Sequence, residues 1–221
     1  VFILSTTSIY ASKDISSLRD IPPIDENAVR VLFIRHAEAV SNTQHDENLT
    51  AEQLDRLTEK GIQQAQAIGK ALTDIPVYKI YCSETHRTLE TIVESGIAEK
   101  NQTNPEQISD FNAMELGTKE EGTPATFADA IQIWQEGKVA RFEGGESYQQ
   151  AITRVMERIR REDDAQGKTI IVVTHSDIIA GVAGAAEWVP EWQRWENFRP
   201  SLASITVMDV IENHPLVLRL F

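Results

Sequence analysis

The sequence is most informative where a short apolar run meets charged and ionisable side chains, at Val29-Arg30-Val31-Leu32-Phe33-Ile34-Arg35-His36-Ala37-Glu38. The first six residues are mainly β-branched and aliphatic, which is typical of a strand that is buried on both faces of a sheet. Comparable apolar runs recur farther along the chain, at residues 77–82, 168–173, 202–208 and 216–220. The sequence therefore predicts a sheet whose central strands are covered on both sides.

Helical segments separate these predicted strands. Apolar side chains return with a helical period at residues 62–72, 84–99, 125–135 and 146–161, and a helix of small residues is expected at 176–186. Strands that alternate with helices, without internal repeats, indicate an α/β fold. We expect a three-layer sandwich with a mainly parallel central sheet and helices on both faces.

Length and composition fit one large domain. The chain has 221 residues, of which 41% are hydrophobic and 25% charged, as in ordinary globular proteins. The 34 acidic residues outnumber the 21 lysines and arginines, so the formal net charge is -13. Because this charge repels nucleic acid and anionic membranes, neither is expected as a partner. The single cysteine, Cys82, excludes an intrachain disulfide and any metal site built from several cysteines.

The N-terminal residues are interpreted separately. We assign residues 1–28 to an N-terminal arm or to the remnant of a signal segment, and residues 29–221 to one domain. Residues 1–11 read like the end of an apolar signal region with Ala11 near a cleavage point, or alternatively like an arm that packs on the domain. A cytoplasmic location is favoured, and a periplasmic or secreted one follows if the signal interpretation holds. No apolar stretch approaches the roughly 18–20 residues of a membrane-spanning helix.

Cationic and imidazole side chains follow three of the predicted strands at the point where each strand ends. They are Arg35 and His36 after the first strand, Arg87 in the helix after the second, and His175 after the strand at 168–173. Because ligands bind beyond the carboxyl ends of parallel strands, we expect these side chains to meet at one edge of the sheet. In an acidic protein, such a cluster suits a phosphoryl group, which arginine binds through its planar fork.

A histidine can supply the reactive atom of this predicted site. An imidazole beside two guanidiniums has its pKa lowered, so it stays neutral near pH 7 and can attack phosphorus. The pattern therefore suggests attack by one histidine, while the arginines and the other histidine hold the equatorial oxygens of the transferring group.

Blocks of residues in a characteristic order make the chain resemble a known family. The blocks are Arg35-His36-Ala37-Glu38 with Asn42; Leu57, Thr58, Gly61, Gln64 and Ala65; Ser83, Arg87 and Thr91; Gly144-Gly145-Glu146-Ser147 with Arg154; and Thr174-His175. Over about residues 29–209 the chain is similar to the histidine phosphatase superfamily, the phosphoglycerate-mutase-like phosphatases of branch 1 type.

The resemblance implies roles for these residues. It implies that His36 is the nucleophile that becomes phosphohistidine, and that no metal or other cofactor takes part. The phosphate contacts it implies are Arg35, Asn42, Arg87, Thr174, His175 and Ser176. The expected partner is a small phosphorylated substrate or inorganic phosphate.

The chain departs from the family pattern at the proton donor. The family carries a Glu four residues before a Gly in the middle loop, and here the residue four before Gly117 is Ala113. Our first interpretation is that Ala113 marks the position of the acid and that the parent protein carries Glu there. In a second, the loop is shifted so that Glu115, or else Glu120 or Glu121, serves as the acid. In a third, the protein has lost turnover and only binds phosphate esters.

Functions from other classes were also weighed. His36-Ala37-Glu38 fits half of a zinc deaminase signature, but the Cys-rich half is absent, and no Gly-rich dinucleotide motif follows the first strand. A catalytically silent phospho-ligand-binding protein is the serious rival. Within the family, residues 101–142 form only a modest, polar middle region, which favours hydrolysis over the phosphotransfer of a mutase.

A tryptophan-rich segment leaves two interpretations open. Trp188, Trp192 and Trp195 lie within eight residues and either line the substrate pocket or cap the end of the sheet. Arg141 and Arg194 are candidates for contact with a second anionic group of the substrate, against the alternative that both are solvated.

Overall fold

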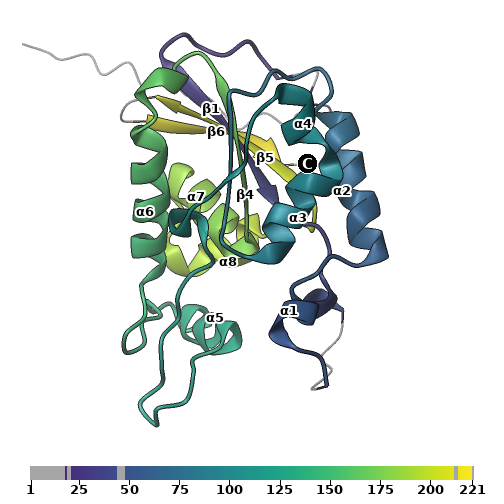
Figure 1. Ribbon diagram of the computed structural model, residues 1–221. Coiled ribbons are helices and arrows are strands. Elements are labelled where there is room, and N and C mark those ends of the chain that lie inside the picture. The colour runs from purple at the N-terminus through teal and green to yellow at the C-terminus, as the bar shows by residue number, and fades with distance from the viewer. Residues whose placement is uncertain (1–17, 19–20, 44–47, 212–213, 221) are drawn as a thin grey trace, which may run out of the picture.

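The computed structural model describes residues 18, 21–43, 48–211 and 214–220, so the interpretation of residues 1–11 lies outside the described residues (Figure 1). The elements, with η for 3-10 helices, are β1 (Ala28–Arg35), η2 (Val40–Asn42), α1 (Ala51–Leu54), α2 (Glu59–Ala71), β2 (Lys79–Cys82), α3 (His86–Ser95), α4 (Ile97–Asn101), β3 (Glu106–Gln107), η3 (Ser109–Phe111), α5 (Phe127–Gln135), α6 (Tyr148–Arg160), η4 (Asp163–Ala165), β4 (Thr169–Thr174), α7 (Ser176–Ala186), α8 (Glu191–Phe198), β5 (Ile205–Ile211) and β6 (His214–Leu220).

The strands form one mixed sheet in the order β3-β2-β4-β1-β5-β6. The neighbours from β3 to β1 are parallel, whereas β5 runs antiparallel to β1 and β6 antiparallel to β5. In the parallel part, Arg35 is level with Thr174, and Cys82 with Val173. The predicted, mainly parallel sheet is confirmed, and its register brings the carboxyl ends of β1, β2 and β4 to one edge.

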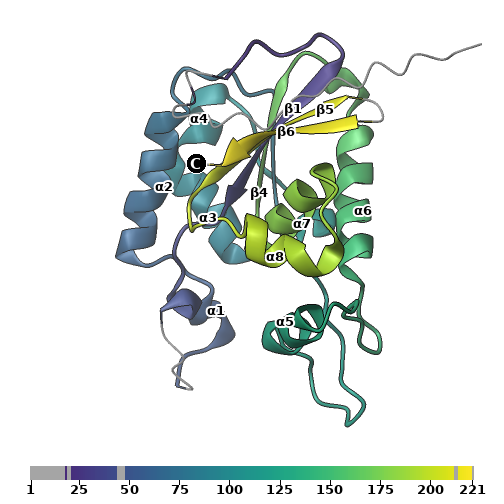
Figure 2. The ribbon, with the colours of Figure 1, turned by 180° about the vertical axis from the view of Figure 1, so that it is seen from behind.

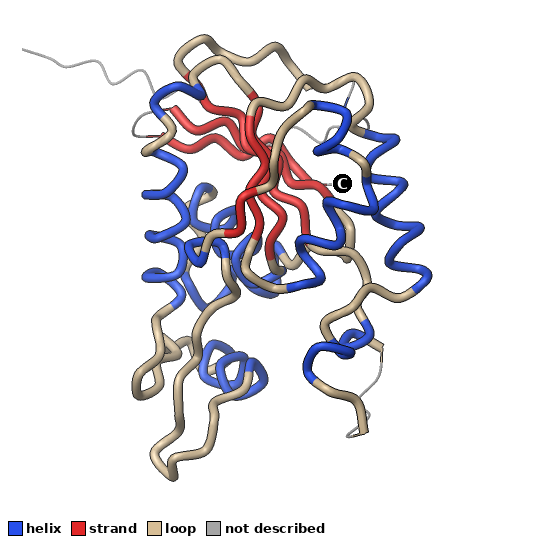
Figure 3. The backbone as a smooth tube through the Cα atoms, viewed as in Figure 1, coloured by secondary structure: helices blue, strands red, loops and turns tan. Residues whose placement is uncertain are grey.

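Helices cover both faces of this sheet (Figure 3). Side chains alternate along β1, so that Val31 and Phe33 join a core with buried residues of α5, α6 and α7. Leu32 and Ile34 face the other way, into a core with buried residues of α2, α3 and α4. The strand is therefore buried on both faces, as its apolar composition predicts. The three-layer α/β sandwich is confirmed.

The structure differs from the predicted elements at several boundaries. The helix predicted at 84–99 ends at Ser95, because Gly96 adopts a left-handed conformation with φ +67°, and α4 follows as a separate helix. The predicted strand at 202–208 begins only at Ile205, after Ala203 at φ +58°. The short elements α1, β3 and α8 were not predicted, because they lack an apolar period long enough to detect.

Two segments extend past the sheet at the end where β1 and β4 finish. One carries α1 and the other carries α5, and they hang on opposite sides of that end (Figures 1 and 2). At the base of α2, a Cβ on Gly61 would stand 2.1 Å from the carbonyl oxygen of Glu38, so only glycine allows this helix to approach the loop after β1. Within the described residues, no helix has the length and apolar composition to cross a membrane.

Candidate active site

The end of β1 places Arg35 and His36 at the carboxyl edge of the sheet. The backbone N–H of His36 donates to the carbonyl of Thr174 (3.0 Å), which continues the β1–β4 ladder by one residue. The carbonyl of His36 accepts from the N–H of Ala203 (3.3 Å), and Nη1 of Arg35 donates to the carbonyl of Pro200 (2.8 Å). The backbone around the first predicted pair is therefore held from two sides.

The tautomer of His36 follows from its hydrogen bond. Nδ1 lies 2.8 Å from the carbonyl oxygen of Ala37, and because a carbonyl can only accept, Nδ1 carries the proton. This leaves the lone pair on Nε2. The loop that orients the ring is fixed in turn, since the N–H of Ala37 donates to Oγ1 of Thr91 on α3 (3.0 Å).

Arg87 is oriented by a carboxylate that the sequence did not single out. Asp55 accepts from the backbone N–H of His86 (2.6 Å) at the start of α3 and from Nη1 of Arg87 (2.5 Å). One side chain thus caps the helix and holds the guanidinium. The other end of the fork, Nη2, donates to Nδ1 of His175 (3.1 Å).

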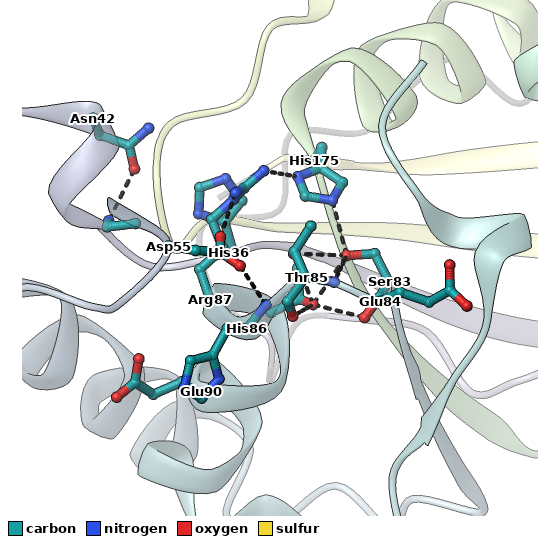
Figure 4. Close-up of polar contacts among 12 residues, drawn as sticks. His36, Asn42, Asp55, Ser83, Glu84, Thr85, His86, Arg87, Glu90 and His175 are labelled. Carbon is teal, nitrogen blue, oxygen red and sulfur yellow. Dashed lines mark hydrogen bonds and ion pairs between the residues drawn. The ribbon is translucent and has the colours of Figure 1, made fainter. Parts of the chain in front are cut away.

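His175 closes the cluster. Because arginine can only donate, Nδ1 of His175 accepts from Arg87, so Nε2 carries the proton and donates to Oγ of Ser83 (2.8 Å). The His175 ring lies edge-on to His36, with 5.4 Å between centroids. Figure 4 shows that Arg87, His36 and His175 point toward one another. The structure therefore brings the two predicted arginines and two predicted histidines to one edge of the sheet.

Burial and like charge lower the pKa values of the two imidazoles and of Arg35. Burial, with the charges of Arg87 and Arg35, lowers the pKa of His36 from 6.5 to about 3. Burial and the same arginines lower the pKa of His175 well below 6.5. Burial, with the charges of Arg199 and Arg87, also lowers the pKa of Arg35 to about 10, although the nearby Asp177 raises it. Both imidazoles are therefore neutral at pH 7, while Arg35 keeps its charge.

The middle loop that carries Ala113 is fastened to the same edge. Arg154 of α6 donates through Nη2 to the carbonyls of Asn112 (2.9 Å) and Ala113 (3.2 Å). The N–H of the next residue, Met114, donates to the buried carboxylate of Asp177 (2.6 Å). Ala113 itself is half-buried. The backbone at the position of the expected acid is thus held by hydrogen bonds, but the side chain there is a methyl group.

The fallback acids lie on exposed parts of this loop. Glu115 is exposed, and its N–H and carbonyl are both bonded to Glu146, which also pairs with Arg154. Glu120 and Glu121 are exposed on the turn that follows. Within the described part of the chain, no hydrogen bond or ion pair joins these three carboxylates to His36 or His175.

Another carboxylate stands beside the loop. Glu84 follows Ser83 directly and is paired with Asn112, whose amide donates to Oε2 (2.8 Å) and whose Oδ1 accepts from the Glu84 N–H (2.8 Å). Its carboxylate lies on the side of Ser83 away from His36 (Figure 4). The sequence did not single out this pair.

The remaining predicted phosphate contacts are less central. Oδ1 of Asn42 accepts from the N–H of Ala39 (2.9 Å), so this side chain caps η2 to one side of the cluster (Figure 4). Thr174 donates through Oγ1 to the carbonyl of Phe111 (2.6 Å), away from Arg87. Ser176 is half-buried as the first residue of α7.

The tryptophans divide into two environments. Trp195 packs on Phe127 of α5, with 4.4 Å between ring centroids, whereas Trp188 is 89% exposed. Arg194 is held away from the cluster because its Nε donates to the carbonyl of Val189 (2.8 Å). An apolar groove of about 710 Å³ lies elsewhere, between α2 and β5, and contains none of the predicted site residues.

The residues missed by the sequence are mainly partners of the predicted ones. Asp55, Ser83, Asp177 and Arg154 orient the predicted side chains or the middle loop. Ser83 and Arg154 were matched to family blocks without a role, while Asp55 gave no signal beyond being a carboxylate in a polar loop. Among the described residues, no group of three or more His, Cys, Asp or Glu side chains could hold a metal ion.

In α/β proteins, ligands bind beyond the carboxyl ends of the parallel strands, and this α/β sandwich carries two arginines and two neutral histidines there. The chain belongs to the histidine phosphatase superfamily (branch 1), whose family model matches residues 31–221. It is 23% identical over 193 residues to the adenosylcobalamin/alpha-ribazole phosphatase of Salmonella typhimurium, covering 83% of this chain and 92% of that protein.

Two solved structures of similar fold carry phosphate-related names. The mycobacterial glucosyl-3-phosphoglycerate phosphatase in complex with VO3 matches with a TM-score of 0.65 and 22% identity, over 86% of this chain and 97% of that chain. Phosphoglycerate mutase from Bacillus anthracis matches with a TM-score of 0.66 and 20% identity, over 87% and 92% of the two chains. Family membership and the phosphatase relative support a phosphatase.

Proposed function

We propose that this protein is a metal-independent phosphomonoesterase that acts on a small phosphorylated metabolite through a phosphohistidine at His36. The observation that carries the proposal is that Arg35, Arg87 and His175 surround the neutral imidazole of His36. Because Nδ1 of His36 donates its proton to the Ala37 carbonyl, the lone pair is on Nε2. A phosphoryl group held by the arginines would lie beside that lone pair.

In this mechanism the arginines bind and the histidine attacks. Arg35 and Arg87 would hold the equatorial oxygens, because Nη2 of Arg87 can turn its bond from His175 to the incoming anion. His175 would then donate Nδ1–H to the same anion after changing to its other neutral tautomer, in which Nε2 accepts from the Ser83 hydroxyl. As Nε2 of His36 bonds to phosphorus, the bond to the ester oxygen breaks and the electron pair leaves with that oxygen.

The leaving oxygen needs a proton, and we propose that a side chain at position 113 supplies it. A carboxylic acid there would protonate the leaving oxygen and afterwards, as a carboxylate, take a proton from the water that hydrolyses the phosphohistidine. We propose that Ala113 removes both steps. The chain as it stands should then cleave esters with good leaving groups and release phosphate slowly from its phosphohistidine.

Two alternatives have specific support. The first is a protein that binds phosphate esters without turning them over, which Ala113 favours. The second is transfer of the phosphoryl group to another acceptor, which the similarity to a mutase favours. We place hydrolysis ahead of mutase chemistry because residues 101–142 form only a modest, polar middle region, with few residues to shield a phosphohistidine from water.

The test is to trap the intermediate. The protein is mixed with 4-nitrophenyl phosphate, and the nitrophenolate burst and acid-labile phosphoprotein are measured. We expect both in this chain, neither in His36→Ala, and both in the matched control His86→Ala, whose ring contacts Arg56 outside the cluster. Full activity in His36→Ala would disprove the mechanism. Phosphate binding without a burst or phosphoprotein would instead establish the binding-only alternative.

A further inference from the structure

A third arginine stands next to the predicted phosphoryl site without a role in the mechanism above. Arg199 directly follows α8, and the next residue, Pro200, accepts the hydrogen bond from Nη1 of Arg35 (2.8 Å). The chain thus leads from α8 to the end of β1, at the same end of the sheet as the site (Figure 2). The sequence suggested Arg141 and Arg194 for a second anionic group, but it did not single out Arg199.

The side chain of Arg199 rests on an aromatic platform. Its guanidinium carbon lies 4.9 Å from the centroid of the Trp195 ring, a cation–π distance. Trp195 packs on Phe127, and Phe127 packs in turn on the buried Trp134, with 5.4 Å between centroids. Because this column runs back into the core, it limits the directions that Arg199 can take. Arg199 is exposed, but its guanidinium has an aromatic ring beside it.

The charge of Arg199 is not balanced by a carboxylate. Within the part of the chain that the structure describes, Arg199 takes part in no salt bridge, although the sequence holds 34 acidic residues against 21 lysines and arginines. Its charge acts on Arg35, whose pKa it helps to lower. Asp177, the carboxylate that opposes this effect on Arg35, is buried and already accepts from the N–H of Met114. An anion near Arg199 would relieve this repulsion.

A single phosphoryl group does not require this third cation. Arg87 already bonds to His175, and the charge of Arg35 acts on both histidines, whereas Arg199 lies on the Trp195 ring. We propose that Arg199 on the Trp195 ring forms a subsite for a second anionic group of the substrate, a carboxylate or a second phosphate. This proposal rests on the proposed phosphoryl site, and it selects, among phosphate esters, those that carry a further negative charge close to the phosphorus.

The proposal is tested by binding rather than turnover, so that the missing acid does not affect it. The probes are ethylphosphonate and 2-carboxyethylphosphonate, which differ by one carboxylate and cannot be hydrolysed. Calorimetry should show that the protein binds the carboxylated probe about tenfold or more tightly, as expected of a charge-assisted hydrogen bond. Arg199→Gln should remove this preference and leave ethylphosphonate binding within about twofold. Arg199→Lys should keep part of it, and Arg160→Ala, which removes an exposed arginine on α6, should keep all of it.

The outcomes separate the two proposals. An equal loss of affinity for both probes in Arg199→Gln would show that Arg199 binds the phosphoryl group itself. An unchanged affinity for both probes would show that Arg199 binds neither group. Each of these results overturns the subsite. Binding of ethylphosphonate without any preference for the carboxylated probe in the unaltered protein overturns the subsite alone. If neither phosphonate binds, the phosphoryl site is wrong and the subsite falls with it.

Discussion

The half of the site around His36 and the half around Ala113 are both held in place by hydrogen bonds from neighbouring residues. They differ in the reactive side chains that they carry. In the first, Asp55 and Ser83 orient Arg87 and His175, and every group that we propose to bind and attack a phosphoryl group is present. In the second, Arg154 and Asp177 form hydrogen bonds with the backbone of the middle loop, yet the side chain at position 113 is a methyl group. The position of the middle loop therefore does not depend on a reactive side chain at position 113, because its hydrogen bonds are made by the backbone.

The largest expected effect comes from restoring the acid. Ala113→Glu should raise the rate on an alkyl phosphate by about 10²–10⁴-fold and raise it far less on 4-nitrophenyl phosphate, whose phenolate leaves with little help. The measurement is the rate over a series of leaving groups, with Ala113→Gln as a control of matched size that carries no acidic proton.

Three results bear on this prediction. In the unaltered chain, added formate should partly restore the rate on the alkyl ester if the space at Ala113 is the acid site. If Glu115→Gln or Glu84→Gln lowers that rate instead, the acid is a different carboxylate. Equal rates in Ala113→Glu and Ala113→Gln would remove position 113 from the mechanism.

A smaller effect, on the binding half, is expected from Arg87→Ala. Loss of a charge-assisted fork should weaken the binding of inorganic phosphate by roughly 10–100-fold. The loss should be alike for all leaving groups, in contrast to the change at Ala113. Calorimetry measures it, with the exposed Arg160→Ala on α6 as the control. A change that depended on the leaving group would show that the two halves are not separable.

A smaller effect again is expected at Asp55, which touches Arg87 and no substrate atom. Asp55→Ala should raise KM for 4-nitrophenyl phosphate by about tenfold through the loss of orientation at Arg87, and Asp55→Asn, which keeps an acceptor for the His86 N–H, should recover part of this. Steady-state kinetics separates KM from kcat. Equal KM values in all three proteins would mean that α3 alone positions Arg87.

The smallest effect concerns stability against pH. The pKa of His36 is about 3 in the folded protein and near 6.5 when unfolded, and His175 is shifted in the same direction. Below pH 6.5 the unfolded chain therefore takes up protons that the folded chain does not, so the unfolding free energy falls as the pH falls. His36→Asn should reduce this slope by up to about 1.4 kcal/mol per pH unit between pH 6 and 4. Urea unfolding at several pH values measures it, and an unchanged slope would contradict the lowered pKa.

Several features of the fold and of the site could be predicted from local sequence. The apolar runs predicted β1, β2, β4 and β5, and the order of strands and helices predicted the sandwich and the edge at which Arg35, His36, Arg87 and His175 meet. These predictions succeed because apolar burial and the carboxyl ends of parallel strands are consequences of pattern and topology. The short α1 and α8, by contrast, carry no such pattern.

What the sequence determined by itself is the class of fold, the family and the residues that meet at the strand ends, including the absence of an acid at position 113. The tertiary structure decided which atoms do what. The protons on His36 and His175, the role of Asp55 and the approach of Arg199 to Arg35 all depend on contacts between distant residues; Arg87 and His175, for example, are 88 residues apart, and Arg35 and Pro200 are 165 apart. Local pattern records burial and chain direction, but it does not record which polar groups come within hydrogen-bonding distance after the chain has folded.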